Sequence, residues 1–395
     1  MIDRAAAQPH YRRAFLDWLA CAAGGWNEPA AAAARAVGDG TTDRVAALAT
    51  AGHVLDFDDT YGPGLSHISA PTAPAALIVG AAAGASIGEV LDAYAAGFEA
   101  MAAVAQASHP ALYERGWHPT AVTGTIGAAT AAASVFGFDG GRTRVAQQLA
   151  VLGAGGLRSA FGTDGKALQV GVAAAQGVRG ALLAGRGAIA ADSIEAGFAS
   201  AYGGEWAEPG ERLAIEENWI KAFPCCLQTH SAIEAAEIAA SQGADTGGSG
   251  VVTVHHRSRQ AAPLDDVTTG LEAKFSIPYV VAFTLLFAAP EVESFTTVDA
   301  AARELASRIS VEIDDDLRQS EAVLVWNGRV NEPPIEVRVA AARGSPDHPL
   351  SDEQLANKVR SLAGTRLDGV FDVTTRPAAE VLALVEQTCT GLLGG

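Results

Sequence analysis

Five short segments of the sequence carry acidic, basic and imidazole side chains at spacings that suit acid–base chemistry. The first, Leu55–His67, holds three aspartates, a threonine and a histidine. Glycine and proline follow the aspartates, so we predict a helix end that runs into a loop. In that loop Asp56, Thr60 and His67 would face a ligand, whereas the simpler alternative is a polar helix terminus. Asp and His also bind metals, but the sequence offers no second His/Asp cluster at ligand spacing, and we predict no metal.

Two further segments place a histidine and a lysine beside turns. His118 precedes Pro119, which holds it near extended geometry and outside a helix. It is either a catalytic group at a loop–helix junction or a structural histidine. Lys166 ends a Gly-Thr-Asp-Gly-Lys run that departs from the phosphate-loop spacing and is followed by Ala167 instead of Ser or Thr. The alternative for this run is a surface turn.

The last two segments contain Lys221 and Tyr279. Lys221 lies among Trp, Ile and Phe and would be partly desolvated there, which suits an anionic ligand, unless its ammonium group extends to water. The adjacent Cys225 and Cys226 are expected to be small core residues, and His230 follows them. Tyr279 lies near a predicted helix start, where a buried hydroxyl needs a partner.

The charge balance limits the classes of ligand. Asp and Glu outnumber Lys and Arg by 45 to 27, for a net charge of −18. This excludes a general nucleic-acid binder, which needs a basic face, but a local pocket can still attract a small anion. The chain has only four lysines. We expect Lys274 to be a helix-face charge beside the Tyr279 motif and Lys358 to be a surface residue of a helix.

The segments that must position these residues are mostly helical. Apolar side chains recur every three or four residues along much of 1–245. The clearest expected helices cover 88–106, 121–136, 143–155, 167–185 and 229–242. Small residues in them would let helices approach closely.

The pattern changes after a turn-rich break at 244–250. We predict strands at 251–254, 310–313, 322–326 and 335–340, with a helix over 271–288. Helix returns after residue 344, starting at a capping box of Ser351 and Gln354 and ending with a helix over 377–393. The fold class is therefore mainly α: a large all-helical domain (1–245, completed by 345–395) with an inserted, smaller α+β lid domain (246–344).

The expected cellular setting is the cytoplasm. The N-terminus lacks the apolar core of a signal peptide, and four scattered cysteines are too few for a disulfide framework. The apolar run 70–88 is rich in Ala, Gly and Pro, so we expect a buried helix and no membrane partner.

The order of the motifs, from Leu-Asp-Phe-Asp-Asp-Thr to Phe-Ser-Ile-Pro-Tyr, resembles the MmgE/PrpD family over nearly the whole chain. The resemblance implies a helical domain with an α+β lid, a homodimer, and an active cleft that holds Asp56, Thr60, His67, His118, Lys166, Lys221 and Tyr279, with His230 nearby. Three features depart from the family pattern. Ile68 instead of Pro follows His67 in a longer loop, Gln169 replaces a frequent His, and the N-terminus is short by about one helix.

The resemblance also implies the chemistry. We expect a lyase without a cofactor that acts on a small di- or tricarboxylate, with 2-methylcitrate-type dehydration first. The alternatives are cis-aconitate-type decarboxylation, epimerisation or isomerisation of a dicarboxylate, and a non-catalytic relative that binds a carboxylate.

The implied roles follow from residue chemistry. Lys166 and Lys221 would bind carboxylates and stabilise negative charge, and His118 and His67 would exchange protons. Asp56 would orient a histidine. Thr60 and His230 would bind substrate, and Tyr279 would close the site or act as an acid.

Overall fold

The computed structural model describes residues 4–328 and 333–386, which form two compact units. One unit combines Met1–Ile220 with Ser351–Gly395, and the other is Lys221–Leu350. The expected fold class, mainly α with a smaller α+β domain, is confirmed.

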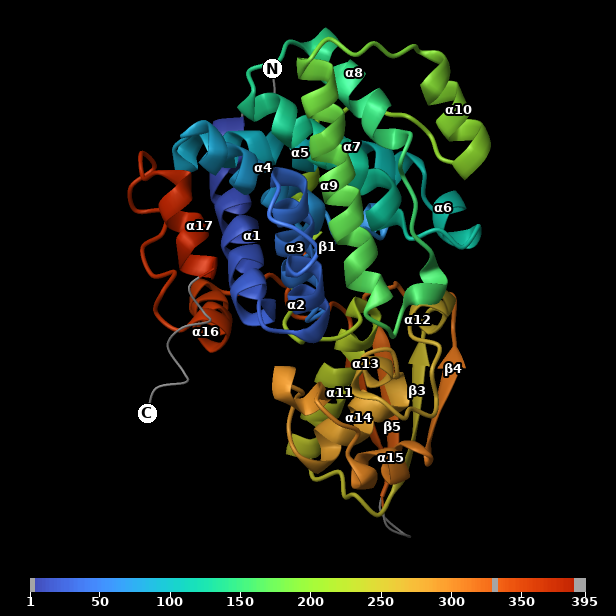
Figure 1. Cartoon of the computed structure of the whole chain (residues 1–395). Coiled ribbons are helices and arrows are strands. Elements are labelled where there is room, and N and C mark those ends of the chain that lie inside the picture. Colours follow the sequence, from blue (N-terminus) through green and yellow to red (C-terminus); the bar gives the residue numbers. More distant parts are fainter. Residues whose placement is uncertain (1–3, 329–332, 387–395) are drawn as a thin grey trace. The chain divides into compact units, whose positions relative to one another are not determined.

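The first unit is a bundle of helices (Figure 1). Its helices are α1 (Arg4–Gly25), α2 (Pro29–Arg35), α3 (Thr41–His53), α4 (Ser69–Ala83), α5 (Ile87–Ala107), α6 (Ala111–Glu114), α7 (Pro119–Val135), α8 (Gly140–Val151), α9 (Gly165–Gly185), α10 (Ser193–Tyr202), α16 (Asp352–Ala363) and α17 (Ala378–Glu386). Two short strands, β1 (Thr60–Tyr61) and β2 (Asn218–Trp219), pair antiparallel within it. The sequence did not predict these strands, because two residues are too few to show alternation.

Small residues allow the central helices to pack closely. Helix α7 packs against α4, α5, α8 and α9. A Cβ added at Gly97 of α5 would lie 2.7 Å from the carbonyl oxygen of Gly127 on α7, closer than carbon and oxygen tolerate. Glycine at this crossing lets the two backbones approach, as the composition predicted.

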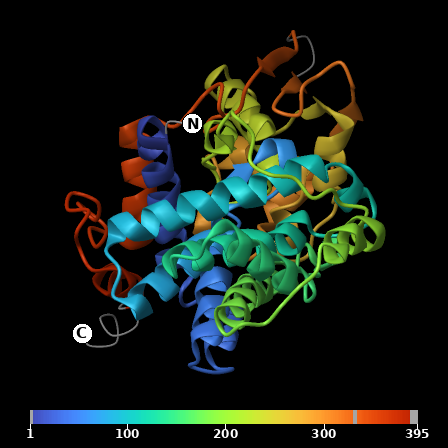
Figure 2. The ribbon, with the colours of Figure 1, turned by 90° about the horizontal axis from the view of Figure 1, so that it is seen from above.

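Helices from the N-terminal and C-terminal parts of the sequence pack together in the first unit. Helix α1 packs against α16, and the two lie side by side in both ribbon views (Figures 1 and 2). The capping box of Ser351 and Gln354 is present at the start of α16. Helix α17 begins one residue after the expected position 377, and the end of that expected helix, with Cys389, lies outside the described residues.

The second unit is a four-stranded sheet with helices. The strands β3 (Ser249–Val254), β4 (Ile309–Ile313), β5 (Ala322–Asn327) and β6 (Ile335–Val339) lie in the order β4-β3-β5-β6. The β3–β4 pair is parallel and the other pairs are antiparallel. The helices are α11 (His230–Ser241), α12 (His256–Ala261), α13 (Gly270–Ala273), α14 (Ile277–Leu286) and α15 (Ala300–Ala306).

Two expectations about the second unit need correction. Helix α11 packs against β5, β6 and α14, so it belongs with the sheet, and the unit begins at Lys221 instead of 246. The helix expected over 271–288 is split into α13 and α14, because Ser276 caps a new helix whose second residue is Pro278.

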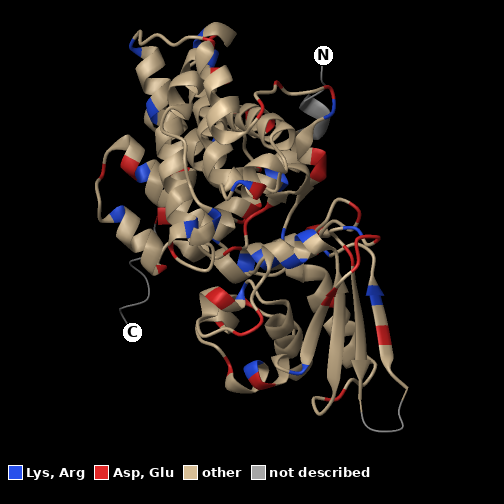
Figure 3. Cartoon of the chain, turned by 90° about the vertical axis from the view of Figure 1, so that its right-hand side faces the viewer, with Lys and Arg blue, Asp and Glu red and all other residues tan. Residues whose placement is uncertain are grey.

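Charged residues are sparse along the ribbon, as 18% of the composition requires (Figure 3). Among the described residues, α9 is long and apolar enough by composition to cross a membrane. However, 56% of its apolar window is buried inside the protein, as in a core helix.

Candidate functional site

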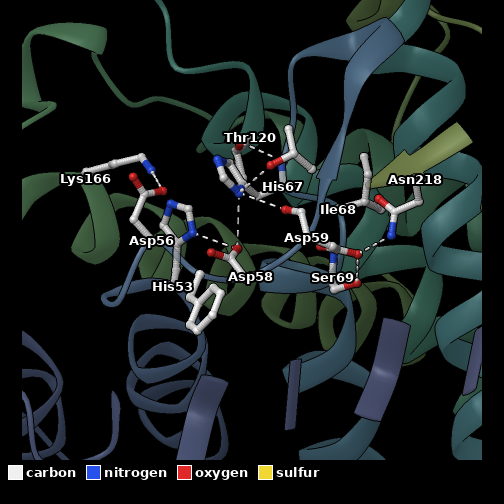
Figure 4. A network of polar contacts seen from close by, with 12 residues as sticks. His53, Asp56, Asp58, Asp59, His67, Ile68, Ser69, Thr120, Lys166 and Asn218 are labelled. Carbon is white, nitrogen blue, oxygen red and sulfur yellow. Dashed lines mark hydrogen bonds and ion pairs between the residues drawn. The ribbon is translucent and has the colours of Figure 1, made fainter. Parts of the chain in front are cut away.

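The loop between α3 and β1 forms one side of a buried polar cluster. Asp56 adopts the left-handed backbone conformation, with φ of 55°, which few non-glycine residues adopt. Its Oδ1 lies 2.5 Å from Nζ of Lys166, at the start of α9 (Figure 4). Both side chains are buried. The expected cation is therefore present but pairs with an aspartate of the same site.

A histidine that the sequence reading did not single out lies at the centre of the cluster. His53, the last residue of α3, contacts Asp58 Oδ2 through Nδ1 at 2.8 Å. His67 Nδ1 lies 3.3 Å from the same oxygen and 2.9 Å from the carbonyl oxygen of Asp59. The hydroxyl of Thr60 is 3.4 Å from His67 Nδ1. Asp58, and not Asp56 as expected, is therefore the aspartate that contacts and orients the histidines.

Burial and the neighbouring side chains act in opposite directions on the pKa of Asp58 and on that of His53. Burial alone would raise the pKa of Asp58, but the adjacent imidazoles of His53 and His67 lower this pKa below its usual range. Burial lowers the pKa of His53, and the Asp58 carboxylate only partly opposes this effect. Asp58 therefore stays ionised, and His53 favours its neutral form.

Asp59 joins the loop to α4 and to β2. Its carboxylate accepts hydrogen bonds from the Ser69 hydroxyl at 2.5 Å and from Asn218 Nδ2 at 2.7 Å (Figure 4). Burial raises the pKa of Asp59 to about 7, with the nearby Asp58 adding to the rise and the Ser69 hydrogen bond opposing it. The Asp59 carboxyl therefore titrates near neutral pH, whereas that of Asp58 does not.

His118 completes the cluster from the N-terminus of α7. Its ring stacks at 6.1 Å on His53 and meets Phe161 edge-on at 4.9 Å. The Phe161 ring also lies 5.6 Å from Lys166 Nζ. Burial lowers the pKa of His118 well below its usual value, and the positive charge of Lys166 acts in the same direction.

Lys358 is not a surface charge as expected. It is buried, and its Nζ lies 2.6 Å from Asp17 Oδ1 and donates to the carbonyl oxygen of Phe57 at 2.7 Å. The Phe57 ring is 3.9 Å from the same ammonium group. Lys358 of α16 thus anchors the loop that carries Asp56 and Asp58. Lys274 is also buried.

The remaining predicted residues belong to the second unit. Lys221 and His230 are buried there, and the His230 ring lies 5.1 Å from Phe223. The Tyr279 hydroxyl accepts a hydrogen bond from the backbone N–H of Asp299 at 2.9 Å. Tyr279 therefore has the partner that a buried hydroxyl needs. Cys225 and Cys226 are buried, as expected of small core residues.

Two groups of described residues have the geometry to hold a metal ion. Ligand atoms of His53, Asp58 and His67 lie within 4.8 Å of one another, as do those of His255, His256 and Asp315. Direct hydrogen bonds between imidazole and carboxylate already account for the first group. This group was not predicted from the sequence, because His53 was not among the predicted site residues. A histidine in the last turn of a helix before an acidic loop is a signal that could have indicated it.

Five of the eight predicted site residues lie in the first unit. Asp56, Thr60, His67, His118 and Lys166 surround the centre formed by His53 and Asp58. A buried group of imidazoles, a lysine and aspartates can move a proton and stabilise a carboxylate in low dielectric surroundings.

Comparisons with known proteins identify the family of this chain. The MmgE/PrpD N-terminal domain family matches residues 45–205, and the MmgE/PrpD C-terminal domain family matches residues 223–379. Human cis-aconitate decarboxylase is 30% identical over 200 residues, which cover 47% of this chain and 41% of the human protein. The mouse cis-aconitate decarboxylase is 27% identical over 345 residues, covering 80% of this chain and 70% of the mouse protein. Because both domain families match in order along the chain, the protein belongs to the MmgE/PrpD family.

Proposed function

We propose that the protein is a lyase that acts on a small di- or tricarboxylate by acid–base chemistry at a carbon next to a carboxylate. Family membership supports an enzyme of the lyase type. The observation that carries the proposal is the buried cluster in which His67 and His118 flank His53, with the Lys166–Asp56 pair beside them. These groups match the needs of carbanion chemistry.

The reaction develops negative charge that the site must stabilise. Removal of a proton next to a carboxylate places additional negative charge on that carboxylate. A cation held in a water-poor site stabilises this charge more than it would in water. Lys166 would exchange its Asp56 partner for a substrate carboxylate. Lys221, His230 and Tyr279 of the second unit remain proposed substrate-binding and catalytic residues on the basis of the family resemblance.

Dehydration of a 2-methylcitrate-like acid is the first candidate reaction. It needs a group that accepts the α-proton and a group that assists the leaving hydroxyl, and the cluster offers several polar side chains for the two tasks. Decarboxylation is the second candidate, supported by the name of the human and mouse relatives. Epimerisation or isomerisation would use the same groups, and a protein that only binds carboxylates is the non-enzymatic alternative.

A panel of di- and tricarboxylates followed by NMR in deuterated water distinguishes these reactions. A new vinyl signal from a hydroxy acid indicates dehydration, release of CO2 indicates decarboxylation, and deuterium at the α-carbon without net conversion indicates epimerisation. No turnover together with thermal stabilisation by a panel acid would indicate binding alone and overturn the proposal.

Substitutions test the site itself. We expect His118→Ala and Lys221→Ala to lose turnover by about 10²–10³-fold while remaining folded, the usual cost of removing one group that stabilises developing negative charge. His10→Ala, which removes an exposed histidine, is the control and should retain activity. Activity near that of the unmodified protein in both site variants would refute the site assignment. A homodimer and a cytoplasmic location are further proposals, testable by light scattering and fractionation.

A further inference from the structure

Gln169 lies one turn after Lys166 on α9, and its amide group bridges two parts of the first unit. The backbone N–H of Leu157 donates to Gln169 Oε1 at 2.8 Å. Gln169 Nε2 donates to the carbonyl oxygen of Leu157 at 3.2 Å and lies 2.6 Å from Nδ1 of His118. The Leu157 contacts determine which end of the amide is nitrogen, so it is the amide nitrogen that faces the histidine.

An amide nitrogen can only donate a hydrogen bond, so Nδ1 of His118 must accept. The proton of the neutral ring is then on Nε2. We infer that Gln169 is a positioning residue that holds His118 in its neutral Nε2–H form, as a fixed hydrogen-bond donor to a substrate oxygen. In this form His118 cannot take up a proton at Nε2, so it is not the base.

The backbone around this contact is held firmly. The N–H of His118 donates to the carbonyl oxygen of Gly156 at 3.0 Å, and the N–H of Arg158 donates to that of Gly116 at 2.9 Å. Gly156 has φ of +117°, and a Cβ there would lie 2.6 Å from the Cβ of Ala121 and 3.2 Å from Gln169 Oε1. Only glycine therefore lets this segment approach both α7 and the amide of Gln169.

The surroundings of His118 also favour a neutral ring. The ring is buried at the start of α7, where the positive end of the helix dipole disfavours a cation. His53, His67 and Lys166 face it with further positive or potentially positive charge, and Asp56 is the opposing carboxylate. A neutral histidine at a helix N-terminus that polarises a substrate oxygen is a known catalytic arrangement.

His67 has the opposite tautomer. Its Nδ1 lies 2.9 Å from the carbonyl oxygen of Asp59, and a carbonyl can only accept. The Nδ1 of His67 therefore carries the proton, and the lone pair of the neutral ring is on Nε2. Given the proposed function, His67, in contrast to His118, has a ring nitrogen able to accept the α-proton, and His118 stabilises the resulting charge without exchanging a proton.

The isosteric variant Gln169→Glu tests this inference. A carboxylate at 169 accepts a hydrogen bond where the amide donates, so it should draw a proton onto Nδ1 of His118. The readout is ¹⁵N NMR of histidine-labelled, substrate-free protein between pH 6 and 8, with the His118 signals assigned from His118→Gln. In the unmodified protein we expect ¹⁵N chemical shifts of a neutral His118 ring with the proton on Nε2, unchanged across this pH range. In Gln169→Glu we expect ¹⁵N shifts of a ring with the proton on Nδ1, or shifts that change with pH.

Activity provides a second readout. Gln169→Glu should lower kcat by about 10²–10³-fold at neutral pH, the usual cost of losing one donor to a developing oxyanion. Part of the activity should return as the pH falls, because protonation restores the Nε2–H of His118. Gln169→Met, which has no hydrogen-bond donor and no titrating group, should lower kcat without this pH dependence.

The matched control is Gln176→Glu on the same helix, whose amide donates to the carbonyl oxygen of Ala150. It should leave the ¹⁵N pattern of His118 unchanged. An Nδ1–H pattern in the unmodified protein, or an unchanged pattern in Gln169→Glu, would overturn the inference. Since the NMR readout needs no substrate, it is independent of the outcome of the carboxylate panel.

Discussion

Asp56 and Asp58 lie two residues apart and serve different partners. Asp56 pairs with Lys166, and Asp58 receives the hydrogen bonds of His53 and His67. Asp56 also adopts the left-handed backbone conformation, which costs a non-glycine residue free energy and is concentrated at functional sites. At the scale of single residues, the loop therefore separates the group that neutralises the cation from the group that orients the histidines.

Asp59 makes stability depend on pH. Its pKa is about 7 in the folded protein and about 3.8 when unfolded, so the folded state holds an additional proton between these values. The free energy of unfolding should fall as the pH rises from about 4 to about 7, by up to about 4 kcal/mol from this group. Urea titrations at several pH values measure this slope.

The Asp59→Asn variant isolates the effect. It lacks the titrating carboxyl, so its free energy of unfolding should decline less steeply over the same pH range. Asp39→Asn, at an exposed aspartate, is the control and should match the unmodified protein. Parallel pH profiles for Asp59→Asn and the unmodified protein would show that Asp59 does not titrate in this range.

At the scale of elements, two helices hold the site in place from distant parts of the sequence. Helix α9 presents Lys166 and Gln169 one turn apart, which places both on one face. Helix α16 supplies Lys358, whose ammonium group joins Asp17 of α1 to the backbone of Phe57. The C-terminal return of the chain is therefore part of the support of the site.

Loss of that support should destabilise the protein. Lys358→Met removes the cation beside the buried Asp17 carboxylate, and we expect the free energy of unfolding to fall by about 3–5 kcal/mol. Asp17→Asn combined with Lys358→Met should recover part of this loss, because no uncompensated buried charge remains. Urea unfolding provides the measurement.

Arg360→Met is the matched control, since Arg360 lies on the same helix with its side chain 57% exposed. Its effect should stay within about 0.5 kcal/mol. If Lys358→Met were no more destabilising than Arg360→Met, the proposed anchoring of the loop would be wrong.

At the scale of the whole molecule, the net charge of −18 opposes an anionic substrate at long range. The cluster around Lys166 is buried and is less affected by salt than the surface charges are. The polycarboxylate would then be repelled at long range by the net charge of the protein, the outer field, and attracted within the site by Lys166.

We therefore expect kcat/KM for a tricarboxylate to rise as NaCl increases from about 10 to 200 mM, because salt screens the outer field over a Debye length of about 10 Å. A steady-state series at fixed pH, with a monocarboxylate as the control of lower charge, measures this effect. The rise should be smaller for the monocarboxylate. A fall in kcat/KM for the tricarboxylate would show that attraction dominates at long range.

The sequence alone indicated more of the fold than of the site. Periodic apolar residues located the helices, and the change of pattern near 250 located the sheet, because these signals are local. They did not assign α11 to the second unit, since which layer a helix joins depends on its packing partner. Nor did they show that Lys358 is buried, because the residue types around a lysine in sequence do not reveal what packs on it.

The residue types and motif order determined the family and the mainly α fold class. They also predicted the site residues, which are Asp56, Thr60, His67, His118, Lys166, Lys221, His230 and Tyr279. Only the tertiary structure decided the partners: Lys166 with Asp56 across 110 positions, His118 with Gln169 across 51, and Lys358 with Phe57 across 301. It also placed His53 at the centre. The reason is that the crossings of α helices, set by close packing of small residues, determine which side chains meet, and no local pattern encodes those crossings.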